Sequence, residues 1–378
     1  MTAFPKPKLA IVHTESSRGW GGQEIRILSE AEGMQARGHR ITLICPPETA
    51  LRREALKRGL ATFDFLNPAK IWRSGRALRA WLKARPDIDV INTHSPADSY
   101  LAAAACATID KPPPLVRTRH VSSPVRGGLL SRWLYRSATR HVVTTGEALR
   151  MKLHREIGLA LQKISSVPTG IDLSLYSPGD KEKAKAALGL PAGGFYLGVV
   201  ASLREWKGHA YLFQALAKLK RRHPDLQLLV IGGGPEQKNL EDLAGRLQLT
   251  NSVRMLGNQD NVSAWFNAMD LFVLPSYAHE GLPQAIMQAM ACGLPVVSTN
   301  VGAIGEAVLH NETGLLVAPR DADSLAEALA RLVGDAKIRR EMSAAAYAHA
   351  QKHFGLEVML DKMEAVFYTA ILKNDRRI

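Results

Sequence analysis

Residues 271–298 read LFVLPSYAHEGLPQAIMQAMACGLPVVS, and this stretch decides the fold. The four apolar residues Leu271–Leu274 predict a buried strand, which a proline then ends. Gln284–Gly293 reads as a packed helix that stops at glycine, and Val296–Ser298 is a second apolar run. Strands that are apolar at every position are typical of a parallel sheet covered by helices on both faces. The stretch therefore predicts one strand–helix–strand unit of an α/β domain.

The same alternation of apolar runs and helical patterns occurs twice along the chain. In the first half the predicted strands are Lys8–His13, Arg40–Cys45, Thr62–Phe65, Val90–Thr93, Leu115–Thr118 and His141–Thr144. Helical patterns between them include Glu24–Arg37, Trp72–Ala84 and Leu129–Thr139. In the second half the predicted strands are Tyr196–Ala201, Gln227–Ile231, Val253–Leu256, Leu271–Leu274, Val296–Ser298 and Gly314–Val317. We therefore predict two doubly wound, Rossmann-like domains facing across a cleft, with ligands at the carboxyl ends of the strands.

A chain of 378 residues exceeds the length at which one hydrophobic core continues to grow, so two domains are expected. The join is predicted near residues 173–193, where proline and glycine cluster. We place the first domain at residues 1–175 and the second at residues 176–355. Residues 356–378 are expected to form a helix that crosses back to the first domain.

The net charge of +14 is concentrated in the first half of the chain. Residues 1–180 contain 27 Lys and Arg but 15 Asp and Glu, whereas residues 181–378 contain 22 and 20. A basic half of this kind favours polyanions, which include nucleic acid, anionic lipid headgroups and phosphorylated substrates.

Targeting and redox signals are weak. The apolar run Leu9–Val12 is too short for a signal-peptide core, and no run approaches the roughly 18 apolar residues of a membrane span. The three cysteines lie far apart and form no CxxC pair, which argues against disulfides and structural zinc. We expect a soluble, cytoplasmic protein.

Two glycine-containing turns follow predicted strands. After the first strand come Gly19, Gly21, Gly22 and Glu24, where backbone amides at a helix start favour an anion. The spacing is not the G-x-G-x-x-G fingerprint of dinucleotide binding, and an ordinary strand–helix turn is the alternative. The second turn is Gly232–Pro235, which a purely structural role explains equally well.

Cations and a carboxylate mark the second half. Arg204 and Lys207, on a turn that ends at Gly208, can close on one diphosphate from two sides, although two solvated surface cations are the alternative. Glu280 follows a strand and precedes a helix start at which the amides of Gly281 and Leu282 are free. On that helix Gln284 and Gln288 share one face. An acid beside amide donors suits a ligand that carries both hydroxyls and phosphates.

The first half carries further candidates. His94 ends a predicted strand that faces the cleft. Two helices have basic faces, one with Arg76, Arg79 and Lys83 and one with Arg132, Arg136 and Arg140 beside Trp133. Such faces fit an anionic membrane surface, to which each cation contributes about 1 kcal/mol, and solvated helix faces are the alternative.

Taken together, the chain resembles the retaining family-4 glycosyltransferases of the GT-B fold, also described as glycosyl transferases group 1. The resemblance rests on Gly21-Gly22-Gln23-Glu24, His120, Pro168-Thr169-Gly170-Ile171-Asp172, Arg204 with Lys207-Gly208, Gly232-Gly233-Gly234-Pro235 and Glu280-Gly281-Leu282-Pro283. These segments occur in the right order across most of the chain.

The resemblance implies a role for each of these residues. The first domain would bind the acceptor, and the second would bind the nucleotide sugar. Glu280 and His120 would be catalytic, contacting the transferred sugar. The donor-binding residues would be Gly21, Gly22, Arg204, Lys207, Gly233, Gly281, Leu282, Pro283 and Gln288. His94 and Glu24 are expected on the acceptor side, and no metal or other cofactor is expected, since no DxD-type carboxylate pair lies near the proposed site.

One residue departs from the family pattern. Gln288 stands where the family usually has a second glutamate that binds the ribose hydroxyls. A glutamine can accept one hydrogen bond through its carbonyl oxygen, but its amino group only donates. A ribose contact remains expected, whereas an ionic role is not.

The sequence therefore predicts a retaining glycosyltransferase that uses a nucleoside-diphosphate sugar, with a UDP-sugar favoured. The acceptor would be a hydroxyl of a glycan or lipid-linked molecule, as in lipopolysaccharide or cell-surface polysaccharide synthesis. The enzyme would lie on the inner face of the cytoplasmic membrane. A sugar-nucleotide epimerase or hydrolase on the same fold is the alternative. A nucleic-acid-binding protein is a remote one, because it leaves the Glu280 segment unexplained and shows no recognition motif.

Overall fold

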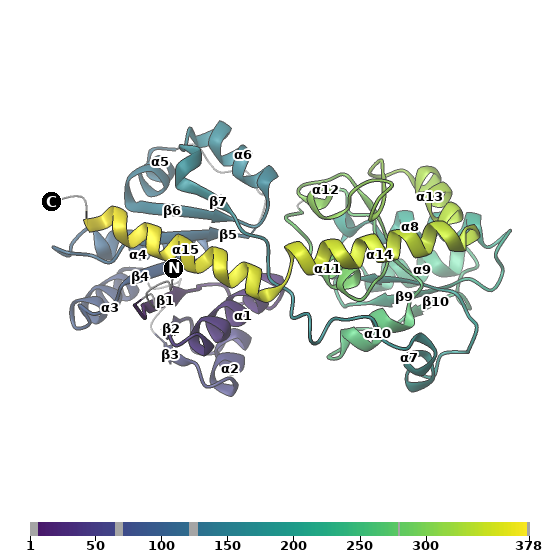
Figure 1. Ribbon diagram of the computed structural model, residues 1–378, viewed down its shortest axis with the longest axis horizontal. Helices are drawn as coiled ribbons and strands as arrows, with labels where there is room; N and C mark the ends of the chain where they lie inside the picture. The colour runs from purple at the N-terminus through teal and green to yellow at the C-terminus, as the bar shows by residue number, and fades with distance from the viewer. Residues whose placement is uncertain (1–6, 65–70, 121–127, 279, 376–378) are drawn as a thin grey trace, which may run out of the picture. The chain divides into compact units, whose positions relative to one another are not determined.

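The computed structural model describes residues 7–64, 71–120, 128–278 and 280–375 (Figure 1). The chain divides into two compact units. Unit 1 comprises Met1–Gly170 and Leu356–Ile378, and unit 2 comprises Ile171–Gly355. The division falls after Gly170, a few residues before the sequence-based boundary at residue 175 and the join predicted at 173–193. The Pro- and Gly-rich segment that suggested the later boundary belongs to unit 2.

Unit 1 alternates strands and helices along the chain. Its elements are β1 Ala10–Thr14, α1 Gly22–Ala36, β2 Arg40–Ile44, α2 Ala50–Lys57, β3 Ala61–Phe63, α3 Ile71–Lys83, β4 Val90–Thr93, α4 Pro96–Cys106, β5 Leu115–Arg119, α5 Leu129–Trp133, β6 Thr139–Thr144, α6 Glu147–Ile157, β7 Ile164–Ser166 and α15 Leu356–Asp375. The strands form one parallel sheet of seven strands, in the order β3-β2-β1-β4-β5-β6-β7. The strand order reverses between β1 and β4, which is the place where open α/β sheets bind ligands.

Helix α15 completes the core of unit 1. It packs against α1 and against strands β4, β5 and β6, as the yellow helix in Figure 1 shows. Met363 and Phe367 of α15 are fully buried in one apolar cluster with Ile27 and Leu28 of α1. The last helix of the chain is thus a structural part of the first unit.

Unit 2 repeats the doubly wound scheme. Its elements are α7 Lys181–Ala187, β8 Tyr196–Val200, α8 His209–Leu219, β9 Gln227–Ile231, α9 Gln237–Arg246, β10 Val253–Met255, α10 Val262–Ala268, β11 Leu271–Leu274, α11 Gln284–Ala291, β12 Val296–Thr299, α12 Ile304–Ala307, β13 Gly314–Val317, α13 Ala322–Gly334 and α14 Ala336–His353. The six parallel strands have the order β10-β9-β8-β11-β12-β13, with the reversal between β8 and β11.

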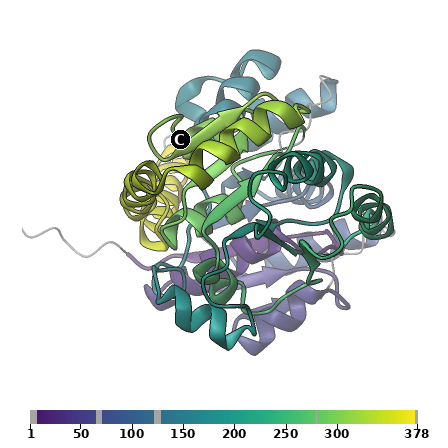
Figure 2. The same cartoon turned by 90° about the vertical axis from the view of Figure 1, so that its right-hand side faces the viewer.

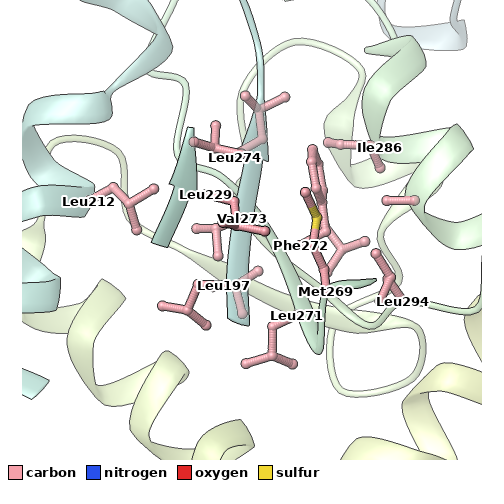
Figure 3. Close-up of a cluster of buried hydrophobic side chains, with 14 of the residues drawn as sticks. Leu197, Leu212, Leu229, Met269, Leu271, Phe272, Val273, Leu274, Ile286 and Leu294 are labelled. Carbon is pink, nitrogen blue, oxygen red and sulfur yellow. The ribbon is translucent and has the colours of Figure 1, made fainter. Parts of the chain in front are cut away.

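The core of unit 2 lies on both faces of its sheet. The green strands of unit 2 run between helices in Figure 2. Helices α8 and α13 pack together, and so do α11 and α14. In Figure 3, Leu212 of α8 and Ile286 of α11 lie on opposite sides of the strands, and Phe272 and Val273 of β11 are fully buried. This burial explains why Leu271–Leu274 is apolar at every position.

Apart from shifts of one or two residues at the ends of several elements, two differences from the sequence-based elements stand out. Strand β7 was not predicted, because two of its three residues are serines and leave no apolar run. The helix predicted at Leu129–Thr139 is helical only to Ala138, by way of a π-helical turn at Leu134–Ala138, and Thr139 already belongs to β6. Phe65, placed in the third predicted strand, lies outside the described residues. Among the described helices, none combines the length and the apolar composition that crossing a membrane requires.

Candidate functional site

The cations of unit 2 lie on the turn that follows β8. Arg204 precedes a 3-10 turn, Glu205–Lys207, and its guanidinium lies 5.2 Å from the centre of the Trp206 ring. Gly208 then adopts a left-handed backbone, with φ of 76°, and starts α8. A Cβ at Gly208 would lie 2.0 Å from the backbone oxygen of Pro275, so only glycine lets this turn approach the end of β11.

That close approach brings Lys207 to Glu280. The Lys207 Nζ lies 2.6 Å from Oε1 of Glu280, although the two residues are 73 positions apart. The Glu280 side chain is only 6% exposed and that of Lys207 is 18% exposed. The pair sits at the β8–β11 strand reversal of unit 2. A partly buried ammonium–carboxylate pair at this edge can hold a ligand that has both phosphate and hydroxyl groups.

Helix α11 begins directly beside Glu280. Pro283 precedes its first residue with an extended backbone, and Leu282 is buried. Among the described residues, the amides of Gly281 and Leu282 have no hydrogen-bond acceptor. Free amides at a helix start favour a negative charge. Gly233 lies on the neighbouring turn, where its backbone oxygen accepts a hydrogen bond from the amide of Leu203 at 3.0 Å.

Gln288 contacts a tyrosine from the start of unit 2. Burial raises the pKa of the Tyr176 hydroxyl, and the nearby Gln288 side chain lowers that pKa by a smaller amount. The Tyr176 ring also packs edge-on against Phe266 of α10, with centroids 6.1 Å apart. A neutral phenol therefore lies near Gln288. The predicted ribose contact of Gln288 stays a prediction.

Unit 1 gathers three histidines at its own strand reversal. His13 comes from β1, His94 follows β4 and His120 follows β5. The Nδ1 of His13 lies 3.0 Å from Nε2 of His94, and the Nδ1 of His94 lies 3.0 Å from Nε2 of His120. Both ring nitrogens of His94 are thus engaged. His94 cannot bind an acceptor through a ring nitrogen without giving up one of these contacts.

Burial keeps these imidazoles neutral. It lowers the pKa of His13 to about 4 and holds the pKa values of His94 and His120 well below the usual value. The positive charge of Arg26 lowers the pKa of His94 and of His120 further. Arg26 is itself fully buried, where it donates to the Val167 oxygen at 2.7 Å.

Buried carboxylates line the same edge of unit 1. Asp98 accepts hydrogen bonds from the Thr14 hydroxyl at 2.7 Å and from the amides of His94 and Ser95 at 3.0 Å. Burial nevertheless raises the pKa of Asp98 to about 7. Glu15, fully buried beside it, also has a raised pKa because of burial. Carboxyl groups in such surroundings are often functional.

The first glycine turn of unit 1 opens α1. Gly21 has an extended backbone, and its oxygen accepts from the Ile25 amide at 3.1 Å. Gly22 is exposed, and Glu24 is buried in the first turn of the helix. A Cβ at Gly21 would meet only the Glu24 carboxylate, at 3.9 Å, so a side chain would fit there.

Sequence reasoning missed several of these residues. His13, Glu15 and Asp98 were not site candidates, because their neighbours in space come from other strands. His209, buried at the start of α8, was also missed, and burial lowers its pKa to about 4. The pattern Ser95-Pro-Ala-Asp98 was a detectable helix-capping signal that could have drawn attention to Asp98. Within each unit, the candidates lie at the strand reversal of that unit's own sheet.

Metal binding has no geometric candidate in the described part of the chain. No group of three or more His, Cys, Asp or Glu side chains there is placed to hold an ion. The expectation that no metal takes part stays a prediction.

Two family models match most of the chain. The model described as Glycosyl transferases group 1 matches residues 180–349, and the one described as Glycosyltransferase Family 4 matches residues 20–175. The D-inositol 3-phosphate glycosyltransferase of Saccharomonospora viridis is 32% identical over 316 residues, covering 80% of this chain and 69% of the relative. The same-named protein of Arthrobacter sp. FB24 is 32% identical over 259 residues, covering 63% of this chain. That alignment spans 61% of the Arthrobacter protein, which is less than two thirds of its length.

Solved structures share the fold at lower identity. A glycosyltransferase from Rickettsia africae superposes with a TM-score of 0.86 at 21% identity, covering 98% of this chain and 100% of the other. The Anabaena protein HepE, solved in complex with UDP, superposes with a TM-score of 0.85 at 22% identity, covering 96% and 100%.

Proposed function

Because the chain belongs to the glycosyl transferases group 1 family, we propose that it moves a sugar from a nucleoside-diphosphate sugar to an acceptor hydroxyl. The predicted family and the predicted GT-B fold are confirmed. A UDP-sugar is the favoured donor, since the structurally similar HepE was solved with UDP. Unit 2 binds this donor, and unit 1 binds the acceptor.

The observation that carries the proposal is the Lys207–Glu280 pair beside Arg204. A diphosphate bound here gains charge-assisted hydrogen bonds from Arg204 and Lys207, and the free amides of Gly281 and Leu282 receive a phosphate oxygen. Glu280 accepts hydrogen bonds from the hydroxyls of the sugar. As the glycosidic bond breaks, the leaving phosphate gathers negative charge that these donors stabilise, without help from a metal ion.

The anomeric configuration of the sugar is retained. A double displacement needs a second carboxylate as nucleophile, and the equivalent helix position holds the neutral Gln288. The acceptor hydroxyl therefore attacks the face from which the phosphate departs, and its proton passes to the departing phosphate oxygen. Glu280 orients the sugar, and His120 contributes a hydrogen bond to substrate.

The acceptor is a hydroxyl of a glycan or of a lipid-linked molecule, such as an intermediate of lipopolysaccharide or cell-surface polysaccharide. What supports an acceptor at a membrane is the surface of unit 1. Leu129 and Leu130 of α5 are 85% and 72% exposed, beside the exposed Arg132. Arg76 and Lys83 of α3 are exposed as well. Such a surface suits anionic lipid on the cytoplasmic face, without nucleic acid as a partner.

A donor screen followed by product analysis tests the proposal. UDP-, GDP- and ADP-sugars are compared by thermal shift, because a bound ligand raises the unfolding temperature with occupancy. The stabilising donor is then incubated with glycan and polyprenyl-linked acceptors, and proton NMR reads the anomeric configuration of the product. We expect a joined product with the configuration of the donor. Free sugar or an epimerised nucleotide as the only product would favour the hydrolase or epimerase alternative, and an inverted product would exclude retention.

A further inference from the structure

The three histidines of unit 1 are joined edge to edge. The ring centroids of His13 and His94 are 5.3 Å apart, and the planes differ by 13°. The Nδ1 of His13 and the Nε2 of His94 are 3.0 Å apart. The rest of the centroid separation equals the sum of the distances from each ring centre to its own nitrogen. The nitrogens therefore lie on the line between the centroids, which gives a coplanar, nearly linear N–H···N bond. His94 and His120 repeat this with centroids 5.2 Å apart and a tilt of 32°.

A chain of three neutral imidazoles has two possible proton arrangements. In one, the Nδ1–H of His13 donates to His94, the Nδ1–H of His94 donates to His120, and the proton of His120 is on Nδ1. In the other, every bond runs in the opposite direction and His120 Nδ1 is a bare acceptor. Each neutral imidazole carries one proton, so the tautomer of one ring fixes the tautomer of the next.

The inner end of the chain favours the first arrangement. Nε2 of His13 is buried and has no hydrogen-bond partner among the described residues. The reversed arrangement would place a proton on this nitrogen, and buried N–H groups without an acceptor are rare in proteins. The low histidine pKa values that result from burial keep a second proton off the chain.

We propose that His13 and His94 are positioning residues that hold His120 in the tautomer with the proton on Nδ1. His120 is partly exposed, so this N–H is available to an oxygen of the substrate. In this state His120 donates a hydrogen bond and cannot remove a proton through Nδ1. The assignment of a sugar or acceptor oxygen as the target of this N–H rests on the proposed glycosyl transfer. The direction of the hydrogen bonds through the three histidines does not depend on that proposal.

Nitrogen NMR of the intact, ligand-free protein tests the direction without any substitution. With ¹⁵N-labelled histidine at neutral pH, two-bond ¹⁵N–¹H correlations report which nitrogen of each ring carries the proton. We expect Nδ1–H in all three histidines. Finding His120 with its proton on Nε2, or as a charged imidazolium, would overturn the proposal. Because no substrate is present, this result is independent of whether the protein transfers sugars.

Paired variants of His94 test its positioning role. In His94→Asn the side-chain amide stands at the place of Nδ1 and still donates to His120, whereas His94→Leu removes the donor. We expect His120 to keep its Nδ1 proton in the asparagine variant and to shift toward Nε2–H, the form that a free imidazole favours, in the leucine variant. His141→Leu removes a buried histidine that contacts Ser165 on the next strand, and it should leave the His120 tautomer unchanged.

Kinetics then separate positioning from packing. Loss of one oriented hydrogen bond predicts a kcat about tenfold lower in His94→Leu, with the donor KM unchanged and near-normal kcat in His94→Asn. Equal losses of kcat in the two variants, with the same His120 tautomer in both, would reduce His94 to a packing residue and overturn its assigned role.

Discussion

Lys207 and Glu280 are counter-ions to each other inside unit 2, so removing one leaves the other charge with little water. For Lys207→Ala we expect unit 2 to lose about 1–3 kcal/mol of stability, because a buried charged group loses its partner. Donor affinity should fall at least tenfold, since the diphosphate loses a charge-assisted contact. Hydrogen exchange in mild urea measures the stability of each unit separately, and calorimetry measures donor binding.

A double variant distinguishes the two effects of this change. Lys207→Met combined with Glu280→Gln replaces both charges by neutral side chains of similar size, so unit 2 should return to within about 1 kcal/mol of the wild type. Donor affinity should remain low. A double variant that binds donor normally would remove Lys207 from the phosphate site. A Lys207→Ala variant of undiminished stability would show that the pair does not stabilise unit 2.

At this scale the sequence predicted single residues better than their partners. Glu280 and Lys207 stood out because prolines and glycines place each at the end of a strand. Their contact, and that of Gln288 with Tyr176, depends on how strands and helices distant in the chain are arranged, which no local pattern contains. His94 was a predicted site residue, but the histidines that contact its ring nitrogens, His13 and His120, come from other parts of the sheet.

Among the elements, the β8–α8 turn has the strictest steric requirement. Gly208→Ala should destabilise unit 2 by about 3 kcal/mol or more, because a positive φ costs roughly 1–2 kcal/mol and the new Cβ overlaps the Pro275 oxygen. Gly193 is the matched control, since its φ is 72° and no atom lies within 4 Å of its Cβ position. Gly193→Ala should cost only about 1 kcal/mol. Hydrogen exchange measures the stability of unit 2 in both variants. Equal losses of stability in Gly208→Ala and Gly193→Ala would contradict the close approach at Gly208.

Element prediction succeeded where burial leaves a continuous pattern and failed where elements are short. Five strands of unit 2, namely β8, β9, β11, β12 and β13, have four or five residues and read as mostly apolar runs. Strand β7 consists of Ile164–Ser166, and two of its three residues are serines. The end of the helix that starts at Leu129 was missed because the π-helical turn keeps a helix-like composition.

For the whole molecule, the charge of unit 1 predicts binding to anionic membranes. Arg73, Arg76 and Lys83 are exposed on α3, whereas Arg79 donates to Thr108 at 2.9 Å and is best left unchanged. Replacing the three exposed cations by Gln should weaken binding to phosphatidylserine vesicles roughly a hundredfold, because each contributes about 1 kcal/mol. Vesicle sedimentation at two salt concentrations measures this, and the variant should be less salt-sensitive.

A triple variant in unit 2 carries the same change in net charge. Arg221, Lys238 and Arg246 are exposed there, and their replacement by Gln should leave vesicle binding nearly unchanged. Equal weakening by both triple variants would indicate attraction by net charge alone. If the α3 variant bound vesicles as well as the wild type, the basic face of α3 would be an ordinary solvated helix face with no role in membrane binding.

The return of α15 to unit 1 has a consequence for the order in which the chain matures on the ribosome. Unit 2 is a single continuous segment, so all of its residues are synthesised before α15. Unit 1 lacks Met363 and Phe367 until that moment, and its apolar face on α1 stays open to water and to chaperones. Although domains generally fold in the order of their synthesis, here the second unit can finish before the first.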